Sequence, residues 1–174
     1  MKIIGLAGWS GSGKTTLVAR LLPMLTARGL RVSTVKHAHH SFDMDKPGKD
    51  SHVHREAGAT EVLVTSAHRW ALLHENRGMP EPSMVDLIRY MTPVDLLIVE
   101  GFKAHPHDKI EISRPANGKP LLARDDPYIV AVATDDVAAI DVAVPVLDLN
   151  DVDAIAEFII AHCGLCEARP HGAA

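Results

Sequence analysis

The chain has 174 residues, with 18 Lys and Arg against 22 Asp and Glu, so its formal net charge is −4. That length is typical of one domain that buries its own core. The acidic balance argues against a general nucleic-acid-binding role, because such proteins usually carry a basic excess. Two cysteines, Cys163 and Cys166, supply no disulfide framework, which fits a reducing compartment.

Membrane insertion and export are not expected either. No apolar run reaches the roughly 18 residues that a membrane-spanning helix needs. The apolar run at 2–7 is too short for a signal peptide and leads directly into glycines. These features predict a cytoplasmic protein that binds neither nucleic acid nor membrane.

Apolar strands alternate with amphipathic helices along the chain. We expect strands at 2–7, 31–36, 61–65, 70–74, 94–99, 109–113, 128–133 and 144–147. We expect helices at 15–27 (kinked at Pro23), 50–57, 83–90 and 152–162. The alternation predicts an α/β fold of the P-loop NTPase type, three-layered, with a mostly parallel central sheet and an antiparallel edge. The stretch at 109–113 alternates charged and apolar residues and is the candidate edge strand.

The domain organisation that we expect is simple. Residues 1–163 are predicted to form a single nucleotide-binding domain, because no linker or repeat divides them. Residues 164–174 are small and polar and are predicted to be a frayed tail.

A glycine-rich stretch follows the first predicted strand. Gly8, Gly13, Lys14 and Thr15 match G-x-x-x-x-G-K-[ST] in full, between a predicted strand and a predicted helix. Glycines let backbone N–H groups approach phosphate oxygens, and the start of the helix adds its positive dipole end. We therefore expect Ser10, Gly11, Ser12, Gly13, Lys14, Thr15 and Thr16 to hold nucleotide phosphates.

A metal-side carboxylate is the second requirement of such a site. The most apolar strand, at 94–99, runs into Glu100, and ligands of open α/β sheets collect at the carboxyl ends of the strands. Thr15 and Glu100 are therefore the predicted Mg²⁺ ligands.

The polar stretch at 36–51 allows three interpretations. His37, His39 and His40 are candidate transition-metal ligands, although no helical i, i+4 pairing joins them. The stretch is equally consistent with a hydrated loop. We favour a nucleotide- or substrate-sensing segment in which Asp43, Asp45 or Asp50 faces Mg²⁺ or water.

The combination of four segments resembles the MobB family, the molybdopterin-guanine dinucleotide biosynthesis adapter proteins. The segments are Gly8–Thr16, the loop at 36–51 with its Asp-x-Asp-x-Pro-Gly-Lys-Asp-Ser run, Ala57-Gly58-Ala59, and Val99-Glu100-Gly101-Phe102-Lys103. The resemblance spans roughly residues 1–150. It implies a homodimer that binds GTP with Mg²⁺ and hydrolyses it weakly. It also implies a partner, the MobA-like nucleotidyltransferase that joins GMP to molybdopterin, with molybdopterin itself as a further ligand.

The same resemblance bears on individual residues. Asp45 and Asp50 match loop positions of the family and are the predicted catalytic positions, where they would orient water. Guanine selection calls for a carboxylate that faces the ring N1–H and 2-amino groups, and Asp135, after the strand at 128–133, is the candidate. The chain has no N-K-x-D motif, so the choice of guanine depends on the resemblance.

Two other function classes use a similar loop. A small-molecule kinase needs a basic lid, whereas the arginines of this chain are scattered. A metal-insertion GTPase would explain the histidines at 37–40, but oxygen-rich loops suit Mg²⁺ better than Ni²⁺ or Zn²⁺. For a GTPase we expect slow turnover, because the chain contains no Gln to orient water and its candidate charge-stabilising residue, Arg114, is on a predicted loop.

Overall fold

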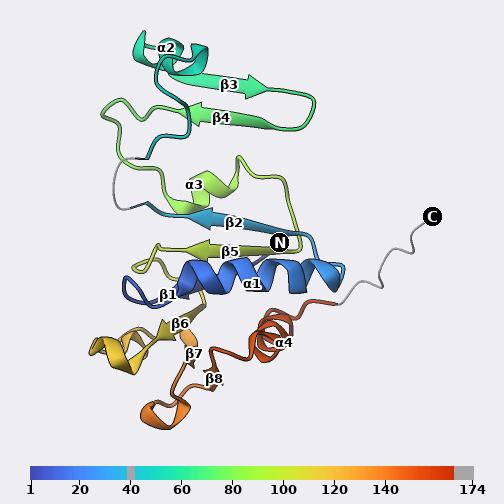
Figure 1. Ribbon diagram of the computed structural model, residues 1–174, viewed down its shortest axis with the longest axis vertical. Coiled ribbons are helices and arrows are strands. Elements are labelled where there is room, and N and C mark those ends of the chain that lie inside the picture. Colours follow the sequence, from blue (N-terminus) through green and yellow to red (C-terminus); the bar gives the residue numbers. More distant parts are fainter. Residues whose placement is uncertain (39–41, 167–174) are drawn as a thin grey trace, which may run out of the picture. The chain divides into compact units, whose positions relative to one another are not determined.

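The computed structural model describes residues 1–38 and 42–166 (Figure 1). They form two compact units. We call the first, residues 1–37 with the chain from 92 onward, the sheet unit. We call the second, residues 38–91, the hairpin unit. The prediction that residues 1–163 form a single domain stays a prediction.

A six-stranded sheet is the centre of the sheet unit. Its strand order is β2-β5-β1-β6-β7-β8, and every pair of neighbours is parallel. The strands are β1 (Lys2–Ala7), β2 (Val32–Lys36), β5 (Leu96–Glu100), β6 (Lys109–Ser113), β7 (Ile129–Thr134) and β8 (Val146–Asp148). Because all six are parallel, their carboxyl ends meet at one edge, which carries the glycine-rich stretch after β1.

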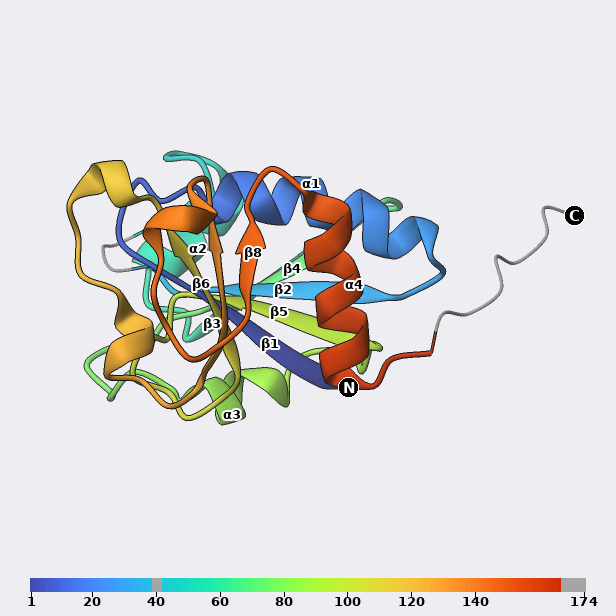
Figure 2. The same ribbon diagram turned by 90° about the horizontal axis from the view of Figure 1, so that it is seen from below.

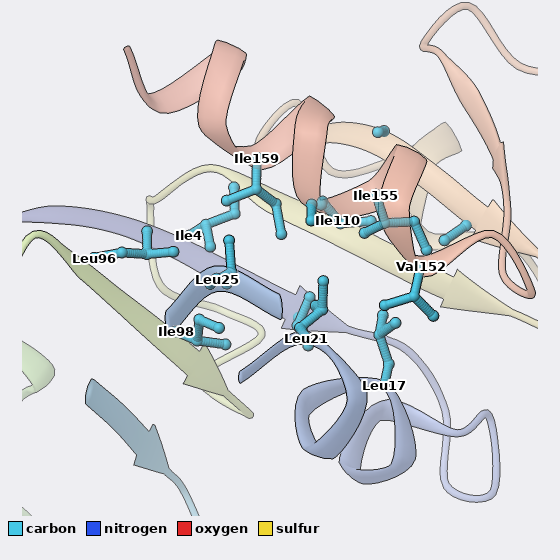
Figure 3. Packing of buried hydrophobic residues seen from close by; sticks show 14 of the residues in the cluster. Ile4, Leu17, Leu21, Leu25, Leu96, Ile98, Ile110, Val152, Ile155 and Ile159 are labelled. Atoms are coloured by element: carbon cyan, nitrogen blue, oxygen red, sulfur yellow. The ribbon is translucent and has the colours of Figure 1, made fainter. Parts of the chain in front are cut away.

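Helices α1 (Lys14–Ala27) and α4 (Val152–Cys163) cover the same face of this sheet (Figure 2). Leu17, Leu21 and Leu25 recur at helical spacing on α1 and are at most 2% exposed. They pack against α4 and the central strands, as Figure 3 shows. The residues that meet there include Ile4, Leu96, Ile98, Ile110, Val152, Ile155 and Ile159. The helix continues through Pro23, as expected, so the stretch is one helix rather than two.

Short 3-10 helices and loops cover part of the opposite face. They are η1 (Pro115–Asn117), η2 (Leu122–Arg124) and η3 (Val137–Ala139). Apolar side chains around η2 and η3 pack over Ala7, Ile129 and Val132. The sheet therefore has a helical layer on one face and a thinner, partial layer of turns on the other, which confirms the predicted α/β fold class.

The expectation that 109–113 is an edge strand is wrong. β6 lies between β1 and β7, and its Lys109 and Glu111 are each 1% exposed. Lys109 fits because it lies opposite Gly5 of β1, where a Cβ would be 2.6 Å from its Cγ. Its ammonium group contacts Asp126 at 3.1 Å and donates to the carbonyl oxygen of His105.

Glu111 is satisfied in a different way. Its two carboxylate oxygens accept the backbone N–H groups of Leu122 and Ala123, at 2.9 and 2.8 Å, at the start of η2. The alternation of charged and apolar residues thus reflects buried charges with their own partners, and not a solvent-facing edge.

The antiparallel part of the structure is a separate two-stranded sheet in the hairpin unit. β3 (Glu61–Thr65) pairs with β4 (Trp70–His74) in the predicted positions. The unit also contains α2 (Asp50–Glu56) and α3 (Met84–Ile88), and Ser83 caps α3 by accepting the N–H of Asp86. On one face of the hairpin Leu63, Trp70 and Leu72 are 59%, 63% and 38% exposed.

Two further sequence expectations concern the membrane and the tail. No helix in the described part of the chain is long and apolar enough to cross a membrane. Helix α4 ends at Cys163, with Gly164 in the left-handed conformation at its cap. Most of the predicted tail, residues 167–174, lies outside the described residues.

Candidate functional site

The segment Gly8–Lys14, which we call the glycine loop, joins β1 to α1 at the carboxyl edge of the sheet. Gly8, Gly11 and Gly13 have φ values of 136°, 79° and 102°, in the region that favours glycine. At Gly8 a Cβ would also lie 2.4 Å from the carbonyl oxygen of Ile112, so no other residue fits there. The glycines of the motif are therefore required by the backbone itself.

The start of α1 offers an anion its free N–H groups. The helix is capped by Gly13 without any side-chain hydrogen bond, and its first turn contains no acidic residue. The first N–H groups of a helix have no partner within the helix, and the dipole adds positive potential there. Among the described residues, no side chain caps the N–H groups of Lys14, Thr15 and Thr16, which lie at the place where the motif predicts phosphates.

Lys14 lies over the glycine loop. Its ammonium group donates to the carbonyl oxygens of Gly8 and Trp9, each at 2.9 Å. Burial lowers the pKa of Lys14, Lys103 and Lys36 lower it further, and only Glu100 acts in the opposite direction. The cations near Lys14 therefore exceed what one carboxylate neutralises, which favours an anionic ligand.

Thr15 and Glu100 face each other across the sheet edge, as the sequence predicts. β5 pairs with β1, so Glu100 ends its strand next to the strand that enters the glycine loop. The Thr15 hydroxyl donates to Glu100 at 3.1 Å, and Lys36 at the end of β2 lies 3.4 Å from the same carboxylate. A hydroxyl and a carboxylate are oxygen donors of the kind that Mg²⁺ prefers, so this pair fits that ion.

Ser12 is buried in the loop, which the motif alone does not reveal. Its side chain is 2% exposed, and its N–H donates to the carbonyl oxygen of Trp9 at 3.2 Å. Its hydroxyl would be 2.9 Å from a Cβ at Gly8, so it faces the inside of the loop. The backbone of Ser12 thus helps to close the loop, its buried hydroxyl has no hydrogen-bond partner in the described part of the chain, and a direct contact of its side chain with phosphate stays a prediction.

Arg114 and Asp135 form an ion pair beside the loop. Arg114 follows β6, and its Nε donates to the carbonyl oxygen of Ser12 at 3.1 Å. Asp135 follows β7, and its bond to Arg114 uses one of its two carboxylate oxygens. The structure thus brings both candidates to the glycine loop, and the predicted contact of Asp135 with guanine stays a prediction.

Three residues near the loop received no role from the sequence alone. The Nζ atoms of Lys103 and Lys119 lie 4.8 and 6.0 Å from the ring centroid of Trp9, inside the glycine loop. Lys103 belongs to one of the four segments on which the family resemblance rests, and this resemblance is the one signal in the sequence that could have identified Lys103. Its position over Trp9 depends on a turn after β5 that no sequence motif predicts.

The predicted catalytic positions Asp45 and Asp50 belong to the hairpin unit. The Asp45 side chain is 6% exposed and pairs with Arg55 at 3.1 Å. Arg55 also contacts Asp43, Glu56 and Glu75, so four carboxylates surround one guanidinium. Asp50 lies in the first turn of α2. Their roles in orienting water stay predictions.

The histidine part of the loop is only partly described. His37 lies at the end of β2, where its ring is 4.8 Å from that of Phe102. His39 and His40 lie outside the described residues. Within residues 1–38 and 42–166, no group of three or more His, Cys, Asp and Glu side chains could hold a metal ion.

A parallel sheet with a glycine loop after its first strand, and with a carboxylate at the end of the neighbouring strand, defines a protein of the P-loop NTPase fold class. The family model described as "Molybdopterin guanine dinucleotide synthesis protein B" (MobB) matches residues 3–135, and this chain belongs to that family.

Relatives and solved structures agree with this assignment. The chain is 43% identical over 161 residues to the "Molybdopterin-guanine dinucleotide biosynthesis adapter protein" of Escherichia coli (strain K12), which covers 91% of each chain. Its counterpart in Haemophilus influenzae is 43% identical over 160 residues, covering 90% of this chain and 86% of that one. A crystal structure of molybdopterin-guanine biosynthesis protein B is similar with a TM-score of 0.71 and 29% identity, covering 92% of this chain and 99% of that chain. The crystal structure of Bacillus subtilis MobB, 23% identical, shares the fold with a TM-score of 0.73 over 94% of this chain and 98% of that one. The chain is thus an adapter protein of molybdopterin-guanine dinucleotide biosynthesis.

Proposed function

We propose that the chain binds GTP with Mg²⁺ at the glycine loop and hydrolyses it slowly. In this role it assists the MobA-like nucleotidyltransferase that attaches GMP to molybdopterin. The observation that carries the proposal is the meeting of Lys14, Thr15 and Glu100 at one sheet edge. The free N–H groups of α1 and the cations around Lys14 suit a polyphosphate.

Each part of the loop has a separate role in this proposal. The N–H groups at 13–16 bind phosphate oxygens, and the Lys14 ammonium exchanges its two carbonyl partners for the outer phosphates. Thr15 and Glu100 would hold Mg²⁺, which neutralises phosphate charge when it is bound. GTP rather than ATP is proposed from the family, since its adapter proteins serve the synthesis of a guanine dinucleotide.

Slow hydrolysis is supported by what surrounds the loop. Arg114 is the nearby arginine, and Asp135 and the Ser12 carbonyl already hold its guanidinium. The chain has no Gln, so a glutamine cannot orient the attacking water. A partner protein that rearranges these groups would link nucleotide turnover to delivery of the pterin, which suits an adapter better than a kinase.

The proposal includes a homodimer. Leu63, Trp70 and Leu72 lie on one face of the β3–β4 hairpin and are all exposed. A second copy that covers this face would remove apolar surface from water. The molar mass of the chain in solution, measured by light scattering, tests this part.

Calorimetric titration tests the nucleotide site. The parent chain should bind GTP more tightly with Mg²⁺ than with EDTA, and Lys14→Ala should weaken GTP binding by about a hundredfold or more, as expected when a charged partner of a phosphate is removed. Lys2→Ala is the matched control. Lys2 begins β1, the strand that leads into the glycine loop, and so lies at the opposite edge of the sheet from Lys14. Equal GTP affinity in Lys14→Ala and the parent would refute the proposed site.

The adapter role has its own readout. Synthesis of molybdopterin guanine dinucleotide by the purified nucleotidyltransferase should accelerate when the parent chain and GTP are added together. Lys14→Ala should give no such acceleration. If the parent itself has no effect on the transferase, the adapter mechanism is wrong even though GTP binds.

A further inference from the structure

The chain makes an unusual turn directly after Glu100. Gly101 and Phe102 have φ values of 97° and 44°, so two successive residues adopt the left-handed conformation. At Gly101 a Cβ would lie 2.7 Å from the Cβ of His37, which leaves room for glycine alone. At Phe102 a positive φ is costly for a bulky side chain and persists only where neighbours hold it.

Aromatic neighbours hold Phe102 in this conformation. Its ring is 4.8 Å from that of His37 at the end of β2 and 6.0 Å from that of His105 further along the same loop. Strained backbone of this kind gathers at functional sites, where the strain fixes a side chain in a useful position. The residue that this turn positions is Lys103.

The turn places Lys103 over the glycine loop. Its Nζ lies 4.8 Å from the ring centroid of Trp9, within the range of a cation–π contact. The Trp9 ring is itself fixed, because its indole N–H donates to the carbonyl oxygen of Pro120 at 2.8 Å. Lys103 therefore rests on an anchored aromatic surface at the entrance to the phosphate site.

Lys103 also lies close enough to Lys14 to act on its charge. Burial lowers the pKa of Lys14, and the nearby charge of Lys103 lowers it further. The Nζ atom of Lys119 lies farther from the same Trp9 ring, at 6.0 Å from its centroid. No carboxylate in the described part of the chain forms an ion pair with Lys103, and Glu100, which acts on Lys14, is already paired with Lys36 at 3.4 Å.

We propose that Lys103 is a positioning residue for the outermost phosphate of the bound nucleoside triphosphate, and that it leaves the Trp9 ring to contact that phosphate. This inference rests on the proposed binding of GTP. The glycine loop encloses the inner phosphates, and the outermost one extends toward Lys14 and the end of β5, where Lys103 stands. A charge-assisted hydrogen bond to phosphate is stronger than a cation–π contact with a partly exposed ring, so the exchange is favourable.

The consequence is discrimination between nucleotides. GDP lacks the phosphate that Lys103 would contact, so it should leave Lys103 on Trp9. GTP should draw the ammonium away from the ring and change the fluorescence of Trp9. The chain would thus distinguish the triphosphate from the diphosphate through one lysine, and Trp9 would report which nucleotide is bound.

Fluorescence titration in a Trp70→Phe background tests this inference, because Trp9 is then the sole tryptophan. Trp70 is 63% exposed, so its replacement removes little packing within the chain, and phenylalanine keeps an aromatic ring on the face that we propose for the dimer. GTP and GDP are titrated with Mg²⁺ into this background, into Lys103→Met and into Lys119→Met. The last variant is the matched control, since it removes a cation from the same ring, but one that lies farther from it, at 6.0 Å against 4.8 Å.

The expected result is specific to one variant and one nucleotide. Lys103→Met should weaken GTP binding about tenfold or more and GDP binding about twofold or less, and the two nucleotides should then give the same Trp9 signal. Lys119→Met should still distinguish GTP from GDP as the background does. Lys103→Gln serves as a second variant if the methionine protein fails to fold.

Three outcomes would overturn the inference. Lys103→Met and the background binding GTP equally well would exclude a phosphate contact. Equal losses of GTP and GDP affinity would place Lys103 away from the outermost phosphate. Equal effects of Lys103→Met and Lys119→Met would show that Lys103 acts only as one of several positive charges near the site. If the background binds neither nucleotide, the proposed GTP site itself fails, which separates that failure from these three.

Discussion

Two charged regions of this chain have opposite balances. At the glycine loop, Lys14, Lys36, Lys103, Lys119 and Arg114 gather around two carboxylates, those of Glu100 and Asp135. In the hairpin unit one guanidinium, that of Arg55, is surrounded by the carboxylates of Asp43, Asp45, Glu56 and Glu75. The first region has an excess of positive charge among the described residues, and the second an excess of negative charge.

The difference separates a binding site from a structural cluster. Arg55 is 15% exposed and Asp45 6% exposed, so each supplies the charge that the other needs under partial burial. At the glycine loop, by contrast, Lys14 has a lowered pKa, and burial, not a partner, is the main cause. A cluster that neutralises its own buried charges gains little from a ligand, whereas one that gathers unneutralised cations gains from an anion.

Among the changes that test this difference between the two regions, the largest effect on GTP affinity is expected at Glu100. Glu100→Gln keeps the shape but removes the charge that faces Thr15 and Lys36. GTP affinity should fall by at least about tenfold in the presence of Mg²⁺ and change much less in EDTA, because the carboxylate acts through the metal. Calorimetric titration under both conditions measures this, and an equal loss in EDTA would remove Glu100 from the metal site.

Much of this edge could be predicted from the sequence, for a physical reason. The loop needs glycines where φ is positive and a lysine directly after the last of them, and this requirement fixes the spacing of these residues in the sequence. Gly8, Lys14 and Thr15 could therefore be identified from the sequence. Glu100 was identifiable because a carboxylate at the end of an apolar strand of a parallel sheet lies at the ligand edge. The strand and helix positions likewise followed from local apolar periodicity.

The remainder depends on contacts between distant segments. The alternation of charged and apolar residues around Lys109 and Glu111 led to the prediction of an edge strand. That prediction was wrong because nothing near these residues in the sequence reveals Asp126 or the N–H groups of η2 as their partners. The approach of Lys103 to Trp9 requires the two left-handed residues after β5, and the tie between Arg114 and Asp135 requires β6 and β7 to be neighbours. Local patterns cannot supply such pairings, since they are set by the packing order of the sheet.

A smaller effect, on the unfolding midpoint, is expected at Arg55 in the hairpin unit. Arg55→Met leaves the nearly buried Asp45 without its cation, so the unfolding midpoint should fall while GTP affinity stays within about twofold of the parent. Arg89→Met is the matched control, because Arg89 forms an exposed ion pair with Asp86 in the same unit. Thermal unfolding and GTP titration are measured together. A loss of GTP affinity at an unchanged midpoint would instead show that Arg55 contributes to nucleotide binding and not to stability.

The smallest effect is a pH dependence at Lys14. Burial holds the pKa of Lys14 below the ordinary lysine value, and Lys103 and Lys36 lower it further against the opposing effect of Glu100. A bound polyphosphate favours the protonated ammonium and therefore raises this pKa. By linkage, affinity must then fall as pH rises through the pKa of the free protein, and the fall must begin at a lower pH than an ordinary lysine would give.

Inorganic tripolyphosphate is the probe for this dependence, because it lacks the guanine ring, and the ionisation of its own phosphates is the same with both proteins and cancels when they are compared. Between about pH 8 and about pH 10 its affinity for the parent should fall relative to its affinity for Lys14→Arg, because only the parent loses the charge at this position. In Lys14→Arg the guanidinium stays protonated throughout this range, so the fall should be shallower although the affinity itself can differ. The change in slope isolates Lys14 from Lys36, Lys103 and Lys119, which both proteins retain. Parallel slopes in the two proteins would show that the polyphosphate does not contact Lys14, and the excess of positive charge at the glycine loop would then need another explanation.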